Sequence, residues 1–146
     1  MSYGFGRLNE LCDRAYNTSK EHGFWDTFDR VKTIRAAILA DYNAAQTLAH
    51  FGIDDEFLVE LENAIIAQKL ALITSEVAEA LEAHRESGFA GHTREDGKPE
   101  GWGSELADVG VRLGDLATKT GVNLEQEWVN KADFNDTRPR KHGKRY

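Results

Sequence analysis

Apolar residues recur at intervals of three and four along most of the chain, a pattern typical of amphipathic helices. It predicts five helices, over about residues 7–21, 26–50, 55–86, 105–119 and 124–138. The only prolines, Pro99 and Pro139, lie outside these segments, so no predicted helix is interrupted by a proline. No alternating strand pattern competes. The expected fold is therefore an all-α, single-domain bundle of about five helices.

Several residues mark where the predicted helices begin and end. Gly23, Gly52 and Gly121 follow the last periodic residues of three of them. Ser104 is a candidate cap for the fourth helix, and Asn123, with Gln126 three positions on, forms a capping-box pattern for the fifth. Residues 87–103 are rich in glycine and polar residues and lack periodicity, which predicts a long loop.

The third predicted helix is the longest and carries a continuous apolar stripe. The stripe consists of Leu58, Leu61, Ile65, Leu70, Ile73, Val77 and Leu81. Spacings of three and four place these side chains on one helix face, so we expect the whole stripe to be buried.

Two pairs of acidic residues carry the strongest candidate chemistry. Glu76 and Glu79 lie three residues apart on the third predicted helix. Glu105 and Asp108 repeat this spacing on the fourth. If the two helices pack antiparallel as a metal-binding pair, the four carboxylates meet, and their repulsion at neutral pH favours binding of a cation. Mg²⁺ takes oxygen ligands and also binds substrate phosphates, so the pattern predicts a site for phosphate chemistry.

The alternative is that these acids form an ordinary solvated helix face. Acidic pairs at this spacing are frequent in helical proteins, and one pair alone is weak support for a metal site. The fourth helix is more informative, because Glu105, Asp108, Arg112 and Asp115 form a continuous charged stripe opposite its apolar residues. In a small bundle such a stripe favours a lined cleft.

The fifth predicted helix offers cationic and polar partners for phosphate. Lys131 and Asn135 lie four residues apart, Trp128 precedes them on the same face, and Arg138 follows where the helix ends. An ammonium, an amide and a guanidinium can all donate to phosphate oxygens. A surface lysine, or a cation placed by the helix dipole, is the simpler interpretation.

Three segments resemble the MazG-like family of all-α nucleotide pyrophosphohydrolases: "SEVAEALEAHR", "GKPEGWGSELADVGVRLGDLA" and "KADFNDTRPRKHGKRY". The family pattern is Glu-x-x-Glu followed, after a variable spacer, by Glu-x-x-Asp. The resemblance extends from about Lys69 to Tyr146.

The resemblance implies a homodimeric or homotetrameric Mg²⁺-dependent enzyme, with Mn²⁺ as a substitute ion. It implies cleavage of a (deoxy)nucleoside triphosphate between the α and β phosphates, giving the monophosphate and pyrophosphate. The metal-binding and catalytic residues would be Glu76, Glu79, Glu105 and Asp108. The substrate-binding residues would be Lys131, Asn135, Arg138 and Arg112.

Two alternatives to this function stay open. Within the same superfamily, the substrate could be dUTP, dCTP or phosphoribosyl-ATP. Outside it, the chain could be a non-enzymatic helical adaptor with a basic tail. A ferritin-like di-iron protein is a poor fit, because that class needs Glu-x-x-His motifs and the chain has none.

The N-terminal half is less informative. The "HGFWD" stretch, residues 22–26, is reminiscent of the family, whereas residues 27–50 look like additional material. Phe24, Trp25 and Trp102 could stack on a nucleotide base or simply pack in the core.

Composition narrows the class of protein. The length of 146 residues suits a single domain, 1–146. The C-terminal tail at 138–146 is basic, with five Lys or Arg residues and no acid. The formal net charge of −7 argues against nucleic acid as a partner. One cysteine, Cys12, excludes an internal disulfide. No apolar run reaches membrane-spanning length, and the first residues lack a secretory signal pattern, so we expect a cytoplasmic protein.

Overall fold

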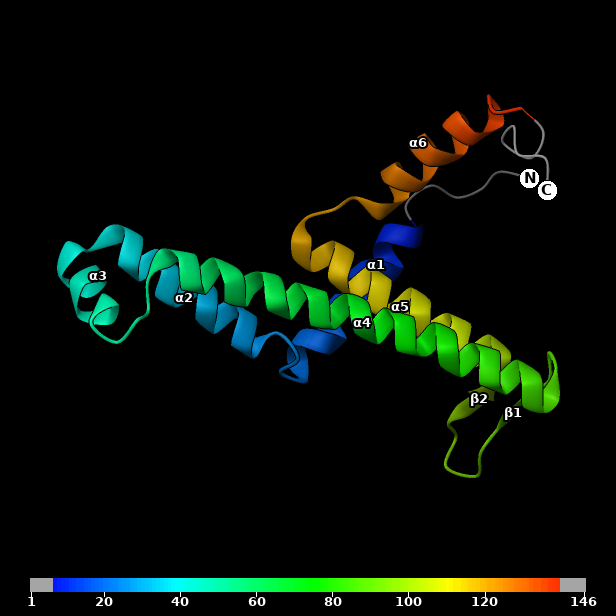
Figure 1. The fold of residues 1–146 in the computed structure, drawn as a ribbon. Coiled ribbons are helices and arrows are strands. Elements are labelled where there is room, and N and C mark those ends of the chain that lie inside the picture. The colour runs from blue at the N-terminus through cyan, green and yellow to red at the C-terminus, as the bar shows by residue number, and fades with distance from the viewer. Residues whose placement is uncertain (1–6, 140–146) are drawn as a thin grey trace.

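The computed structural model describes residues 7–139, which form six helices and one short hairpin (Figure 1). The elements, in chain order, are α1 (Arg7–Glu21), α2 (Asp26–Ala40), α3 (Tyr42–Ala49), α4 (Asp55–Ser87), β1 (Gly91–Thr93), β2 (Pro99–Gly101), α5 (Trp102–Thr120) and α6 (Leu124–Asp136). Helices account for 77% of the described residues. The prediction of an all-α single domain is confirmed, with six helices where about five were expected.

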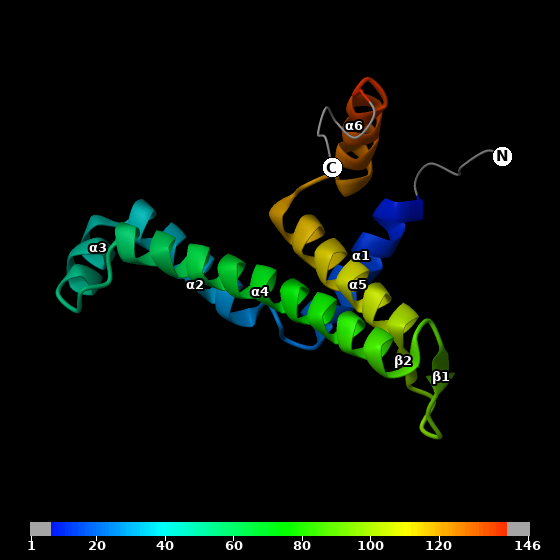
Figure 2. The same ribbon diagram turned by 45° about the vertical axis from the view of Figure 1, so that its right-hand side comes forward.

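The 33-residue helix α4 is the axis of the fold. At a rise of 1.5 Å per residue it is about 50 Å long. Its first half packs against α2, and its second half packs against α5, which returns antiparallel to it (Figures 1 and 2). Helix α1 packs on α5. The antiparallel α4–α5 pair is therefore the part of the fold that carries both acidic motifs.

The predicted helix over residues 26–50 is wrong in one respect, because the chain breaks it at Asp41. This residue has an extended backbone, with φ −135° and ψ 115°. Its carboxylate accepts hydrogen bonds from the backbone N–H groups of Asn43, at 2.8 Å, and Ala44, at 3.3 Å. A side-chain cap of this kind begins a new helix, so α2 and α3 are separate elements.

The sequence predicts a loop over residues 87–103, but the structure shows that this segment contains the hairpin β1–β2. The strands pair antiparallel, with His92 opposite Glu100. Gly101 ends β2 at φ 104°, and a Cβ there would lie 2.6 Å from the carbonyl oxygen of Ala90, so only glycine fits. Because α5 begins directly after Gly101, Ser104 is not its cap; the Ser104 hydroxyl instead donates to the carbonyl of Pro99.

The apolar stripe of α4 is buried or partly buried in its first half and largely exposed farther along, where only Ile73 is partly buried. Leu58 is 2% exposed and forms the core under α2 with Val31 and Ile38. Farther along, Leu70, Val77 and Leu81 are about half exposed, at 51%, 52% and 48%. There the buried residues of α4 are Glu76 and Ala80. The expectation of a fully buried stripe is therefore wrong, because α5 covers a different face of α4.

Helix α1 approaches α5 closely. A Cβ added to Gly114 of α5 would lie 3.0 Å from the Cα of Cys12 on α1. This close approach at the buried Cys12 packs α1 tightly against α5.

Helix α6 begins as predicted, because the Asn123 side chain accepts from the backbone N–H of Gln126 at 3.0 Å. It ends at Asp136, before Pro139. Most of the basic tail, residues 140–146, lies outside the described residues. Among residues 7–139, no helix is both long and apolar enough to cross a membrane.

Candidate metal centre

Three carboxylates from the two facing helices converge between α4 and α5. Glu76, Glu105 and Asp108 each offer one oxygen, and these three oxygens lie within 4.8 Å of one another. Glu76 is buried at 5% exposure, Glu105 is partly buried and Asp108 is exposed. The group is therefore open to solvent on one side and closed on the other.

Arg112 balances the most buried of these carboxylates. Its Nε and Nη2 atoms both lie 2.5 Å from Oε1 of Glu76. Arg112 is four residues after Asp108, so both side chains project from one face of α5. A buried carboxylate is costly unless it is paired. Both of these contacts are to Oε1.

The electrostatics of the group favour an added cation. The pKa of Glu105 is raised above its usual value of 4.5, first by desolvation and then by the charges of Asp108, Glu79 and Glu76, with Lys98 acting in the opposite sense. Ionised carboxylates that repel one another in this way are stabilised by a divalent cation.

The donor set fits Mg²⁺ or Mn²⁺. All three donors are carboxylate oxygens, the type that hard divalent cations prefer. Ligands around one octahedral Mg²⁺ at about 2.1 Å lie roughly 3–4 Å apart, and the oxygens here are within 4.8 Å of one another. Small side-chain rotations are sufficient to close that difference.

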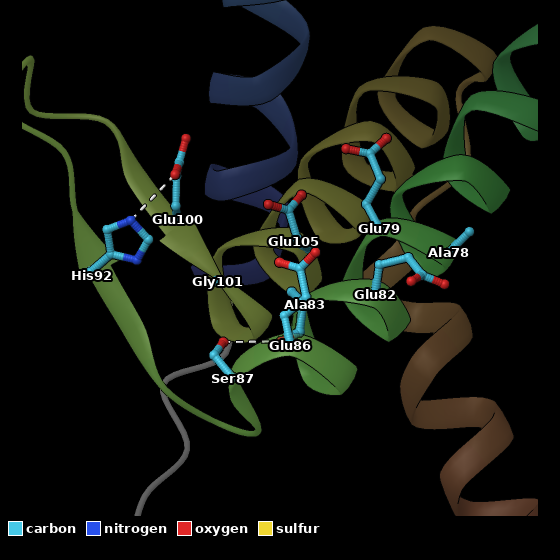
Figure 3. A pocket seen from close by; sticks show the side chains of 10 residues that line it. All are labelled: Ala78, Glu79, Glu82, Ala83, Glu86, Ser87, His92, Glu100, Gly101 and Glu105. Carbon is cyan, nitrogen blue, oxygen red and sulfur yellow. Dashed lines mark hydrogen bonds and ion pairs between the residues drawn. The ribbon is translucent and has the colours of Figure 1, made fainter.

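Glu79 lies beside the three carboxylates, in an acidic cavity of about 380 Å³ (Figure 3). The charged and polar lining comes from α4, from α5 and from the hairpin. It comprises Glu79, Glu82, Glu86, Ser87, His92, Glu100 and Glu105. In Figure 3 the carboxylates of Glu79 and Glu105 rise side by side from the facing helices. Glu79 is exposed and does not belong to the close group of three.

Glu82 is the third acid of the stretch "SEVAEALE". It is 62% exposed and forms an ion pair with Arg85 on the same helix. It lines the cavity but, like Glu79, stands apart from the three converging oxygens.

The structure does not bring the α6 residues to the carboxylates. Lys131, Asn135 and Arg138 are all exposed, and α6 packs on α1 and α5 while pointing away from α4 (Figures 1 and 2). The charged groups of Lys131 and Arg138 each lie 5.9 Å from the ring centre of Phe134. Of the four candidate substrate-binding residues, only Arg112 lies at the centre.

A second polar cluster lies farther along the contact between α4 and α5, which we call the seam. Trp25 is 1% exposed, and its indole N–H donates to Oδ1 of Asp115 at 2.6 Å. The Ser19 hydroxyl donates to Oδ2 of Asp115 at 2.9 Å. Asp115 thus completes the charged stripe of α5, and Trp25 is a core residue with no face free to stack on a base.

Lys69 is the residue of this region that the sequence reasoning missed. Its ammonium lies 4.3 Å from the Trp25 ring centre and donates to the carbonyl of Phe24 at 3.1 Å. The signal was present, because Lys69 precedes Glu76 by seven residues, a spacing that returns to the same helix face.

Comparisons with protein-family models, with curated proteins and with solved structures each found no match to this chain. Membership of the MazG-like family therefore stays a prediction, based on the motifs between residues 69 and 146.

Proposed function

We propose that this protein is a Mg²⁺-dependent nucleoside triphosphate pyrophosphohydrolase, which releases a nucleoside monophosphate and pyrophosphate. The observation that supports this function most is the convergence of Glu76, Glu105 and Asp108 within 4.8 Å across an antiparallel helix pair. These are three of the four acids in the Glu-x-x-Glu and Glu-x-x-Asp pattern. The chemistry of the site and the resemblance of the sequence thus favour the same reaction.

The chain's own residues divide the work at this site. Glu76, Glu105 and Asp108 would hold the ion, and bound Mg²⁺ supplies positive charge that stabilises the phosphates during hydrolysis. Arg112 pairs with the buried Glu76 and holds its carboxylate in place. Glu79 is exposed beside the centre, so it is the carboxylate we assign as the base that takes a proton from the attacking water.

Completing the substrate site requires a second copy of the chain or a movement of α6. Lys131, Asn135 and Arg138 bind phosphate only if they approach the centre, from which α6 points away. The half-exposed apolar face of α4, formed by Leu70, Val77 and Leu81, is the surface we assign to a homodimer or homotetramer contact.

Nucleotide turnover tests this function. A panel of ribo- and deoxynucleoside triphosphates, including dUTP and dCTP, and phosphoribosyl-ATP is incubated with the protein in Mg²⁺, Mn²⁺ or EDTA. Chromatography then follows nucleoside monophosphate and pyrophosphate. We expect pyrophosphate from at least one nucleotide, and only when a divalent ion is present. Failure with every nucleotide would leave the adaptor function as the alternative.

Two neighbouring glutamates provide a matched pair of variants. Glu79→Gln should lower turnover by roughly 100-fold or more, as expected for the loss of a general base. Glu82→Gln, three residues on and paired with Arg85, should leave turnover near that of the wild type. Equal turnover in the two variants would remove Glu79 from the mechanism.

A further inference from the structure

Lys69 has an unusual environment for a lysine on the long helix α4. Its ammonium sits over the rings of Trp25, at 4.3 Å, and Phe24, at 5.6 Å, and donates to the Phe24 carbonyl at 3.1 Å. These contacts hold the charged end of a flexible side chain in one place. Lys69 is thus ordered before any ligand binds.

Three cations act on one another in this region: Lys69, Arg112 and Lys119. Among the described ion pairs, Lys69 is the one of these three without a carboxylate partner. Arg112 pairs with Glu76, and Lys119 pairs with Asp29. Among the described residues, no carboxylate lies within ion-pair distance of Lys69.

Asp115, whose charge raises the pKa of Lys69, does not form an ion pair with it. Asp115 attracts Lys69 at longer range, but its two oxygens already accept from Trp25 and Ser19. Desolvation lowers the pKa of Lys69, and the charges of Arg112 and Lys119 lower it further. A partly buried ammonium in such surroundings is stabilised by an added anion.

The position of Lys69 relative to the metal centre indicates which anion. Lys69 lies seven residues before Glu76 on α4, two helical turns or about 10 Å along the axis. Arg112 on the facing helix contacts Glu76, and its charge also lowers the pKa of Lys69. A ligand that extends from the three carboxylates along this seam meets Arg112 and then Lys69.

We infer that Lys69 and Arg112 form an oxyanion subsite that binds the end of a polyphosphate chain whose other phosphates lie at the metal centre. This inference rests on the proposed function for the identity of its ligand. A polyphosphate presents several oxyanions in a row, and an ammonium and a guanidinium are the side chains that bind them best. Lys69 thereby adds an α4 residue to the substrate contacts.

Binding of inorganic tripolyphosphate, measured by isothermal titration calorimetry in Mg²⁺, tests the subsite. Lys69→Gln should raise the dissociation constant by roughly 10- to 100-fold, the effect of losing one charged hydrogen bond. Lys69→Arg, which keeps the charge, should recover most of the affinity. Lys32→Gln is the matched control, because it removes a lysine that pairs with Glu62 away from the seam, and it should bind as the wild type does.

The outcomes separate this inference from the proposed function. Mg²⁺ binding without phosphate should be unchanged in Lys69→Gln, because Lys69 is not a metal ligand. Wild-type affinity for tripolyphosphate in a folded Lys69→Gln variant would overturn the subsite even if the wild type hydrolyses nucleotides. Lysine-dependent tripolyphosphate binding without any turnover would instead support the subsite and count against the enzyme. If Lys69→Gln does not fold, loss of affinity in Lys69→Arg would overturn the inference as well.

Discussion

Arg112 of α5 donates a 2.5 Å hydrogen bond from Nε to Oε1 of Glu76 on α4, and its Nη2 atom forms an ion pair with the same oxygen at 2.5 Å. Glu76 is 5% exposed, so this ion pair lies at the base of the three-carboxylate group and joins the two helices that form it. The contact therefore holds one candidate metal ligand in place.

Removing Arg112 should destabilise the fold. Arg112→Met leaves the Glu76 carboxylate buried without its partner, and we expect the free energy of unfolding to fall by about 1–3 kcal/mol. Urea denaturation measures the change. The double variant Arg112→Met with Glu76→Gln should recover part of the loss, because the uncompensated charge is gone. No recovery in the double variant would mean that packing of the arginine stem dominates.

The raised pKa of Glu105 predicts a pH-dependent stability. The folded state binds the Glu105 proton more tightly than the unfolded state does, so this residue costs stability as pH rises from 4.5 through its raised pKa. Above that range, Glu105→Gln should be more stable than the wild type, whereas below it the two should converge. Urea denaturation at several pH values measures the difference. A constant difference at all pH values would contradict the electrostatic cause.

Trp25 should be important for stability through its hydrogen bond as well as its size. Trp25→Phe keeps an aromatic ring but removes the donor to the buried Asp115, and we expect a loss of about 1–3 kcal/mol. Thermal or urea denaturation measures this loss. Phe24→Leu, at a neighbouring ring that is 66% exposed, is the control and should change stability much less. Equal losses in the two variants would contradict the role of the Trp25 hydrogen bond.

The exposed apolar face of α4 predicts self-association. Light scattering should give the wild type a mass above that of one 16.4 kDa chain. Val77→Lys should shift it to the monomer, because the charge would be buried in the contact. Leu39→Lys changes a residue of α2 that is 67% exposed and should leave the mass unchanged. A wild type that is monomeric and active would exclude the predicted oligomer.

Local sequence signals predicted the ends of several elements. Helix α1 runs over Arg7–Glu21 as expected, and Asn123 caps α6 through the predicted contact with Gln126. Asp41 was missed because the helical periodicity continues across it, although its side chain caps α3. The hairpin was missed because three-residue strands are too short to show an alternating pattern.

The candidate site was predictable in part. Spacing within each helix placed Glu105 near Asp108, and antiparallel packing added Glu76. Spacing could not reveal that Arg112 would pair with Glu76, because that contact depends on the register between the two helices. It also could not reveal that the stripe through Val77 faces outward, because periodicity identifies an apolar face but not what covers it.

The central claim is that Glu76, Glu105 and Asp108 bind a divalent cation, and Mn²⁺ binding followed by electron paramagnetic resonance tests it most directly. The wild type should bind Mn²⁺ at a saturable site from which Mg²⁺ displaces it. Asp108→Asn should lose that site, whereas Asp133→Asn, an exposed carboxylate on α6, should retain it. Equal Mn²⁺ binding by Asp108→Asn and the wild type would contradict the claim.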